Sequence, residues 1–91
     1  LMTRAVIVGY ARTPFHFANK GDLKGVRPDD LAAAVIKGLL DKVKVNPVEI
    51  EDLLLGCAFP EGEQGLNVAR LIVLLAGLPL NIGGTTINRF C

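Results

Sequence analysis

The residues best suited to chemistry lie at the carboxyl end of the sequence, where Asn88-Arg89-Phe90 leads to Cys91. The β-branched run Thr85–Ile87 precedes them and favours a strand. A cysteine just beyond a strand becomes a nucleophile if a helix starts behind it, because the N-terminus of that helix stabilises the thiolate. The alternative is that Cys91 is a small buried residue, which is the commonest role of a free cysteine.

Four other residues are weaker candidates for chemistry. Cys57 lies inside an apolar run and is expected to be part of the core. His16 is the only histidine, and no acidic neighbour in sequence orients it as a base, so we expect a packing or surface role. Glu61 and Glu63 stand among glycines and a proline, which indicates a solvated loop and not an acid–base pair. The spacing of the two cysteines and the histidine fits no zinc pattern, so no metal site is expected.

Three charged residues are better explained by structure than by catalysis. Arg12 follows an apolar run and is expected to form an ion pair at the end of a strand. Asp29 and Asp30 follow Pro28, and carboxylates in the first turn of a helix are favoured by its positive end. We therefore interpret the two aspartates as capping residues and not as a catalytic pair.

The composition describes one modest folded unit with unusually apolar surface. The 91 residues are 51% hydrophobic and 21% charged with a formal net charge of +1, and the mean hydropathy is +0.42. This value is high for a small domain, which indicates that part of the surface is covered by more of the chain or by a partner. No basic stripe predicts nucleic-acid binding. No apolar stretch is long enough for a membrane span, and no targeting signal is visible, so a cytoplasmic location is expected.

Alternating elements predict an α/β fold with a mostly parallel sheet covered by helices. In such sheets reactive groups gather beyond the carboxyl ends of the strands, which is where Cys91 stands. The predicted elements are, in order, a strand at Ala5–Tyr10, a helix from Pro28 to about Leu40, a short helix from Asn46 to about Glu51, a strand at Leu53–Phe59, a helix at Asn67–Ala76 and a strand at Thr85–Asn88.

Local signals set the expected ends and faces of the helices. Asn46 and Asn67 are placed to cap the second and third helices, and Gly77 is placed to end the third. The third helix is apolar on all sides beyond Arg70, so it is expected to be buried or to lie at a subunit interface. The first helix has one predicted apolar face, formed by Leu31, Ala34, Val35, Gly38 and Leu39 and widened by Ala32, Ile36 and Leu40.

Two motifs together resemble the thiolases, the acetyl-CoA acyltransferases that include the 3-ketoacyl-CoA thiolases. They are Leu75-Ala76-Gly77-Leu78-Pro79 and Gly84-Thr85-Thr86-Ile87-Asn88-Arg89-Phe90-Cys91, which contains an Asn-x-x-Cys signature. Matching stretches in the same order cover nearly the whole chain. The resemblance implies a layered αβαβα fold in which residues 1–91 form the first part of the N-terminal domain, with the rest of the enzyme beyond residue 91.

The resemblance also implies a mechanism. The Cys91 thiolate would attack the 3-keto carbon of a 3-ketoacyl-CoA, acetyl-CoA would leave, and coenzyme A would take the acyl group from Cys91. The backbone N–H of Cys91 would help to form an oxyanion hole. Acyl-CoA and coenzyme A are then substrates, no prosthetic group is expected, and a homodimer or homotetramer is implied. The catalytic histidine and second cysteine of the family would lie downstream, so this segment alone is expected to be inactive.

Departures from the family pattern leave other hypotheses open. Gln64 and Asn67 are separated by two residues, so the loop is longer than usual, and Leu71 stands where the family often has glutamine. A ketoacyl synthase of the same superfold would have two downstream histidines, or a histidine and an asparagine, in place of the second cysteine. A non-catalytic lipid-binding or scaffold protein, or a 91-residue module, is the remaining alternative. The residues after Cys91 would distinguish these hypotheses.

Overall fold

The first helix, α1 (Pro28–Val43), begins as the sequence predicts. The computed structural model describes residues 3–90. Pro28 opens α1, and Asp29 and Asp30 lie in its first turn. The helix continues three residues past the predicted end and stops at Lys44, which has a left-handed φ of 59°. Its short successor η1 (Pro47–Glu49) is capped by Asn46, whose side chain accepts a hydrogen bond from the Val48 N–H at 3.1 Å, as predicted.

The buried face of α1 differs from the predicted one. Ala34 and Gly38 are exposed, whereas Ala33 is buried. Helix α2 packs against a different side of α1 from the one that the helical period predicted. The prediction was sensitive to this choice because apolar residues lie on two neighbouring sides of α1. The residues of α1 that pack against the core are Ala32, Ala33, Ile36 and Leu40.

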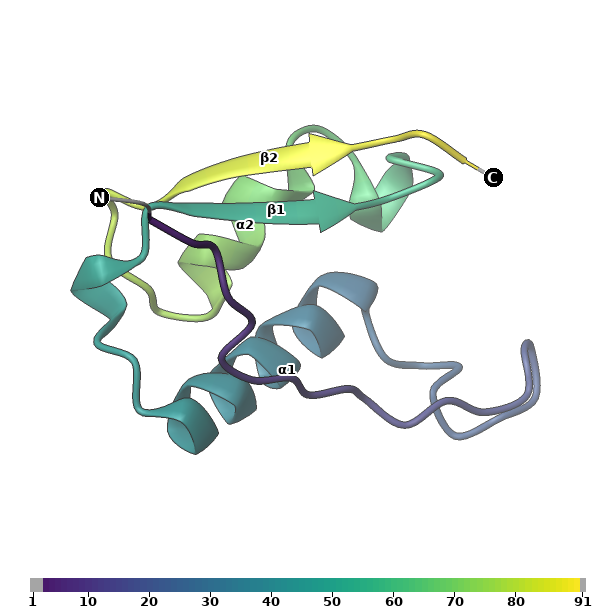
Figure 1. Ribbon diagram of the computed structural model, residues 1–91. Helices are drawn as coiled ribbons and strands as arrows, with labels where there is room; N and C mark the ends of the chain where they lie inside the picture. The colour runs from purple at the N-terminus through teal and green to yellow at the C-terminus, as the bar shows by residue number, and fades with distance from the viewer. Residues whose placement is uncertain (1–2, 91) are drawn as a thin grey trace.

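A parallel strand–helix–strand unit follows, and it confirms the predicted α/β class. Strand β1 (Asp52–Gly56) pairs with β2 (Gly83–Ile87) in parallel, with Asp52 opposite Gly83 and Gly56 opposite Ile87. The two strands run side by side toward the same end of the molecule (Figure 1). Between them lie the short helix η2 (Gly62–Gln64) and helix α2 (Val68–Leu75). Helix α2 packs on the sheet, and α1 packs on α2.

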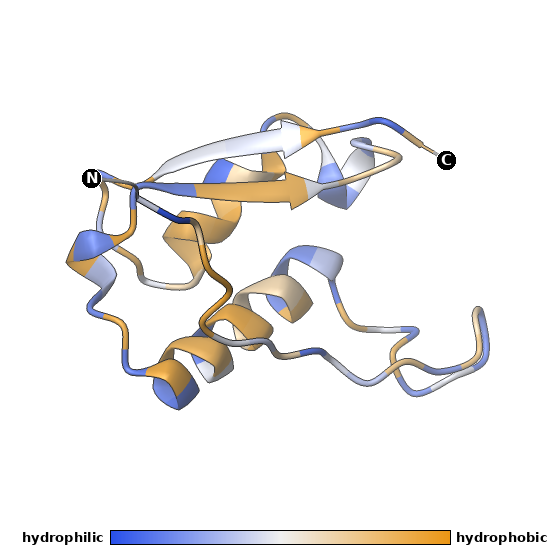
Figure 2. Ribbon diagram, in the orientation of Figure 1, coloured by the Kyte–Doolittle hydropathy of each residue, from blue (hydrophilic) through white to orange (hydrophobic). Residues whose placement is uncertain are grey.

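The core is formed around α2. The largest fully buried side chains are those of Val68, Ile72, Val73 and Ile82, the last lying just before β2. Apolar residues cover α2 and β1, whereas β2 is pale because it consists mostly of glycine and threonine (Figure 2). Gly77 ends α2 with a φ of 70°, and the Leu78 N–H donates back to the Val73 carbonyl at 3.1 Å. The predicted stop at Gly77 is confirmed.

Two apolar surfaces of the strand–helix–strand unit remain exposed within the described residues. Leu53 and Leu55 of β1 face the helices, but Leu54 on the opposite face of the sheet is 65% exposed. The outer side of α2 carries Leu71 and Leu74, which are 40% and 48% exposed. The sheet and α1 cover two sides of α2. Its outer side stays exposed within residues 3–90, so the prediction of full burial is not met there, and the subunit interface stays a prediction.

The predicted strand Ala5–Tyr10 is wrong for this structure. The segment is extended but forms no strand, and Ile7 is 93% exposed. It runs along α1 instead (Figure 1), where the Lys42 ammonium donates to the Tyr10 carbonyl at 3.3 Å and lies 4.5 Å from the centre of its ring. A β-branched run becomes a strand only when another strand supplies the hydrogen bonds, and within residues 3–90 none pairs with it.

Candidate active site

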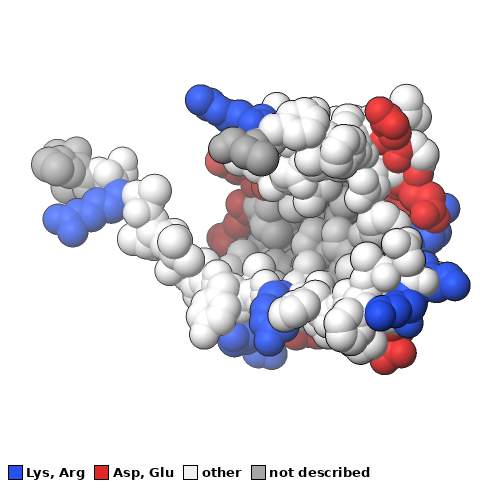
Figure 3. All heavy atoms as spheres, turned by 90° about the vertical axis from the view of Figure 1, so that its right-hand side faces the viewer, with Lys and Arg blue, Asp and Glu red and all other residues white. Residues whose placement is uncertain are grey.

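The carboxyl ends of β1 and β2 form a groove of about 600 Å³. Its lining includes Cys57 and Phe59 after β1, and Ile87, Arg89 and Phe90 at the end of β2. Figure 3 views the molecule from the side toward which both strands run, and it shows a hollow with charged side chains of both signs around it. Cys91, the predicted nucleophile, lies outside the described residues, and the residue directly before it is part of this lining.

The segments that follow β1 and β2 stay in contact beyond the ends of the strands. The Cys57 N–H donates to the Ile87 carbonyl at 2.9 Å, which extends the ladder by one bond. The rings of Phe59 and Phe90 then meet edge to face, with centroids 5.6 Å apart and planes at 82°. The contact between Phe59 and Phe90 was not predicted from the sequence. A signal existed, because each phenylalanine stands three residues after one member of the paired positions Gly56 and Ile87.

The backbone turns at Phe90. Its φ is 47°, in the left-handed region, which a bulky residue adopts only at a cost on the order of 1 kcal/mol or more. The contact with Phe59 helps to hold Phe90 in this conformation. Strained backbone conformations are common at active sites, so the strain at Phe90 supports a functional site at this end of the sheet.

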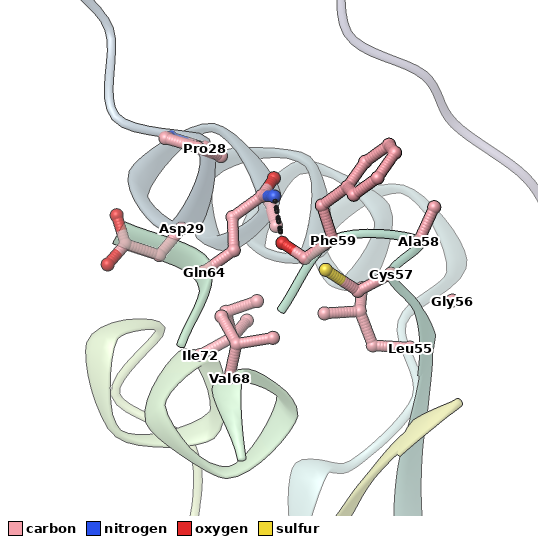
Figure 4. Close-up of a pocket in the computed structure, with 11 residues that line it drawn as sticks. Pro28, Asp29, Leu55, Gly56, Cys57, Ala58, Phe59, Gln64, Val68 and Ile72 are labelled. Atoms are coloured by element: carbon pink, nitrogen blue, oxygen red, sulfur yellow. Dashed lines mark hydrogen bonds between the residues drawn. The ribbon is translucent and has the colours of Figure 1, made fainter. Parts of the chain in front are cut away.

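Cys57 lies at the edge of the core and not in the middle of a strand. It follows the last residue of β1, is half-buried and packs against the core. Its sulfur points into a second pocket of about 310 Å³, whose lining includes Gln64, Val68 and Ile72 (Figure 4). The prediction of a core contact is confirmed, whereas the predicted strand Leu53–Phe59 ends early, at Gly56.

The acidic residues near this pocket form structural ion pairs. The Arg27 guanidinium binds the Asp29 carboxylate with two hydrogen bonds, at 3.0 and 3.1 Å, and reaches the Glu63 carboxylate at 3.1 Å. The same Asp29 accepts a hydrogen bond from the Asp30 N–H at 2.8 Å, as expected of a capping residue. The hydrogen bond from Arg27 is the main cause that holds the pKa of Asp29 below its ordinary 3.8. Asp29 is therefore a carboxylate at neutral pH and does not donate protons.

The loop residues lie apart from these contacts. His16 is exposed, and its Nδ1 accepts a hydrogen bond from the Asp22 N–H at 3.1 Å, which confirms the predicted surface role. The predicted ion pair of Arg12 is wrong for residues 3–90, because Arg12 donates to the Thr13 carbonyl and lies over the Phe15 ring. An exposed arginine with no nearby carboxylate takes the contacts that its own loop offers.

Among residues 3–90 no three histidine, cysteine or acidic side chains are grouped closely enough to hold a metal ion. No helix within that range is both long and apolar enough to cross a membrane.

Comparison with known proteins identifies the family. The family model described as thiolase, N-terminal domain, matches residues 5–91, so the chain belongs to the thiolase family. It is 52% identical over 90 residues to a 3-ketoacyl-CoA thiolase of Bacillus subtilis, an alignment that covers 99% of this chain and 23% of that protein. A 3-ketoacyl-CoA thiolase of Saccharophagus degradans is 48% identical over 87 residues, covering 94% of this chain and 22% of the relative. One from Vibrio vulnificus is 47% identical over 91 residues, covering 99% and 24%. The chain thus spans about a quarter of the length of these relatives.

Proposed function

We propose that the protein carrying this chain is an acetyl-CoA C-acyltransferase that cleaves 3-ketoacyl-CoA by thiolysis, with Cys91 as the nucleophile. One observation carries the proposal. Cys91 follows Phe90, which lines the groove at the carboxyl ends of two parallel strands, in a chain of the thiolase family. Reactive groups of α/β proteins gather at this edge of the sheet. We propose further that residues 1–91 are the first part of a larger N-terminal domain.

The first half of the reaction forms an acyl-enzyme. The thiolate of Cys91 adds to the 3-keto carbon, and the carbonyl oxygen takes the negative charge, which the Cys91 N–H helps to stabilise. The bond between carbons 2 and 3 then breaks. The acetyl-CoA carbanion takes a proton and leaves, and the acyl group remains on Cys91 as a thioester. The groups that move protons in this step belong to the protein outside this chain.

The second half returns the thiol. The sulfur of coenzyme A adds to the acyl carbon, the bond to the Cys91 sulfur breaks, and a shortened acyl-CoA leaves. The groove offers apolar contacts to an acyl chain, because Phe59, Phe90 and Ile87 are part of its lining. The reaction run in reverse condenses two acyl-CoA units.

The test is to trap the acyl group and to remove the nucleophile. Partial turnover of the complete protein with acyl-CoA should place the acyl group on the peptide that contains Asn88–Cys91. Cys91→Ser should lower the rate by about three orders of magnitude or more, as expected when an essential nucleophile is lost. Cys57→Ser is the matched control and should keep most of the activity. Label on Cys57, or full activity in Cys91→Ser, would contradict the proposal.

We also propose that the complete protein is a dimer or tetramer. The outer side of α2 supports this, because Leu71, Leu74 and Leu75 are each 40% exposed or more and form an apolar stripe that a second subunit can cover. Light scattering at micromolar concentration measures this directly, and a stable monomer contradicts it. We also propose a cytoplasmic location, because a reducing compartment keeps free thiols from forming disulfides, and cell fractionation checks this.

A further inference from the structure

The N-terminus of α2 is capped by a residue of β2. Asn67 occupies the usual capping position, but its side chain makes no capping bond to α2. The Thr86 hydroxyl oxygen accepts a hydrogen bond from the Ala69 N–H at 3.1 Å instead. This N–H is one of those that a helix leaves free at its start, so Thr86 does the work of an N-cap from a separate element.

Asn67 completes a small network with Thr86. The Thr86 hydroxyl donates to Asn67 Oδ1 at 2.7 Å, and Asn67 Nδ2 donates to the Gly84 carbonyl at 2.8 Å. Each polar atom is used in the direction that its chemistry allows. We call the hydrogen bonds between Asn67, Ala69, Gly84 and Thr86 the α2–β2 clamp.

The clamp holds the edge of β2 that faces away from β1. The Gly83 N–H and the Ile87 carbonyl both bond toward β1. Because peptide groups alternate in direction along a strand, the Gly84 carbonyl between them points to the other edge. Asn67 and Thr86 therefore fix β2 from its second side, and only Ile87 to Phe90 separate Thr86 from Cys91.

Close contacts between α2 and β2 lie beside the clamp. An added Cβ at Gly84 would lie 2.6 Å from the Arg70 backbone nitrogen, so α2 and β2 touch backbone to backbone. The Arg70 guanidinium also donates to the carbonyl of Ile82, just before β2. These contacts and the pairing with β1 do not depend on the clamp, so we expect its loss to move the chain at the end of β2 without unfolding the strand.

We propose that Asn67 and Thr86 are positioning residues for Cys91, because their hydrogen bonds set where the chain leaves the sheet. The inference rests on the proposed function. Reaction geometry makes it measurable, since a misplacement of about 1 Å can cost on the order of a hundredfold in rate. In this proposal Thr86 acts through the position of β2 and not by touching the substrate, because its hydroxyl bonds to Ala69 and Asn67.

The test uses the complete protein with three substitutions of neighbouring threonines. Thr86→Val keeps the shape but removes the hydroxyl, and it should lower kcat about tenfold with KM within about twofold. Thr86→Ser keeps the hydroxyl and should restore kcat to within about twofold. Thr85→Val is the matched control, because Thr85 is exposed on the opposite face of the strand, and it should also stay within about twofold.

Thiol reactivity separates positioning from loss of the fold. The rate of Cys91 alkylation by iodoacetamide, followed against pH, should fall in Thr86→Val and not in Thr86→Ser. If Thr86→Val fails to fold, Asn67→Ala serves instead, because it leaves the bond from Ala69 to Thr86 in place, and it should lower kcat about threefold. Equal kcat and equal alkylation in Thr86→Val and Thr86→Ser would overturn the inference while acyl labelling of Cys91 still supported the proposed function. Acyl labelling elsewhere would overturn both.

Discussion

Residues 68–87 and residues 3–27 contain similar apolar amino acids but differ in burial and in secondary structure. In the first region Ile72 and Ile82 are completely buried, and hydrogen bonds join α2 to β2. In the second region Val6 and Ile7 are 73% and 93% exposed, and neither helix nor strand forms. The difference shows that an apolar, β-branched run is not sufficient for a strand. A strand forms only where a partner makes hydrogen bonds to the backbone of the run.

Substitutions of one isoleucine in each region test this difference in burial most directly. In the 91-residue chain Ile72→Ala should lower the free energy of unfolding by about 2–5 kcal/mol, because the side chain is fully buried and a cavity remains. Ile7→Ala removes the same atoms from an exposed site and should change it by less than about 0.5 kcal/mol. Urea unfolding measures both. Equal losses would mean that residues 3–27 are packed as tightly as α2.

One glycine in each region tests the same difference in packing. Gly84→Ala forces a Cβ against the backbone of α2 and should destabilise by about 1–3 kcal/mol, because helix and strand must move apart. Gly25→Ala is the matched change in the exposed region, where no atom lies within 4 Å of the added Cβ. It should stabilise by about 0.4–1 kcal/mol through the unfolded chain. Thermal unfolding of the two variants separates these outcomes, and a tolerated Gly84→Ala would show that α2 and β2 are not in close contact.

The smallest expected effect lies at the boundary between the regions, where Arg27 binds Asp29. The pKa of Asp29 is lower in the folded state than the ordinary 3.8, so its contribution to stability is present above that pH and is lost as the pH falls through the folded pKa. Asp29→Asn should therefore destabilise at neutral pH, and its difference from the unmodified chain should shrink in acid. Urea unfolding from pH 7 to pH 2 tests this, with the exposed Asp30→Asn as control. A difference that is constant with pH would contradict it.

Much of the framework could be predicted because its signals are local. Pro28 and the aspartates after it mark the start of α1, Asn46 caps η1, and Gly77 ends α2 by adopting a left-handed conformation. The alternation of strands and helices indicated a parallel pair, and β1 and β2 form one. It also indicated that reactive groups lie beyond the carboxyl ends of the strands, and the structure has a groove there, lined in part by Phe90. Each of these predictions depends on residues within a few positions of one another or on the order of the elements.

The hydrogen-bond and packing partners of Asn67 and of Ala5–Tyr10 could be seen only in the tertiary structure. Asn67 has the sequence context of a capping residue, yet its side chain bonds to Gly84 and Thr86, which lie 17 and 19 residues further along the chain. Ala5–Tyr10 has the composition of a strand, yet it lies along α1. In both cases the sequence by itself determined what a residue can donate, accept or bury. The packing of α2 between α1 and the sheet determined what stood within reach, because hydrogen bonds form only between groups that the fold brings to about 3 Å.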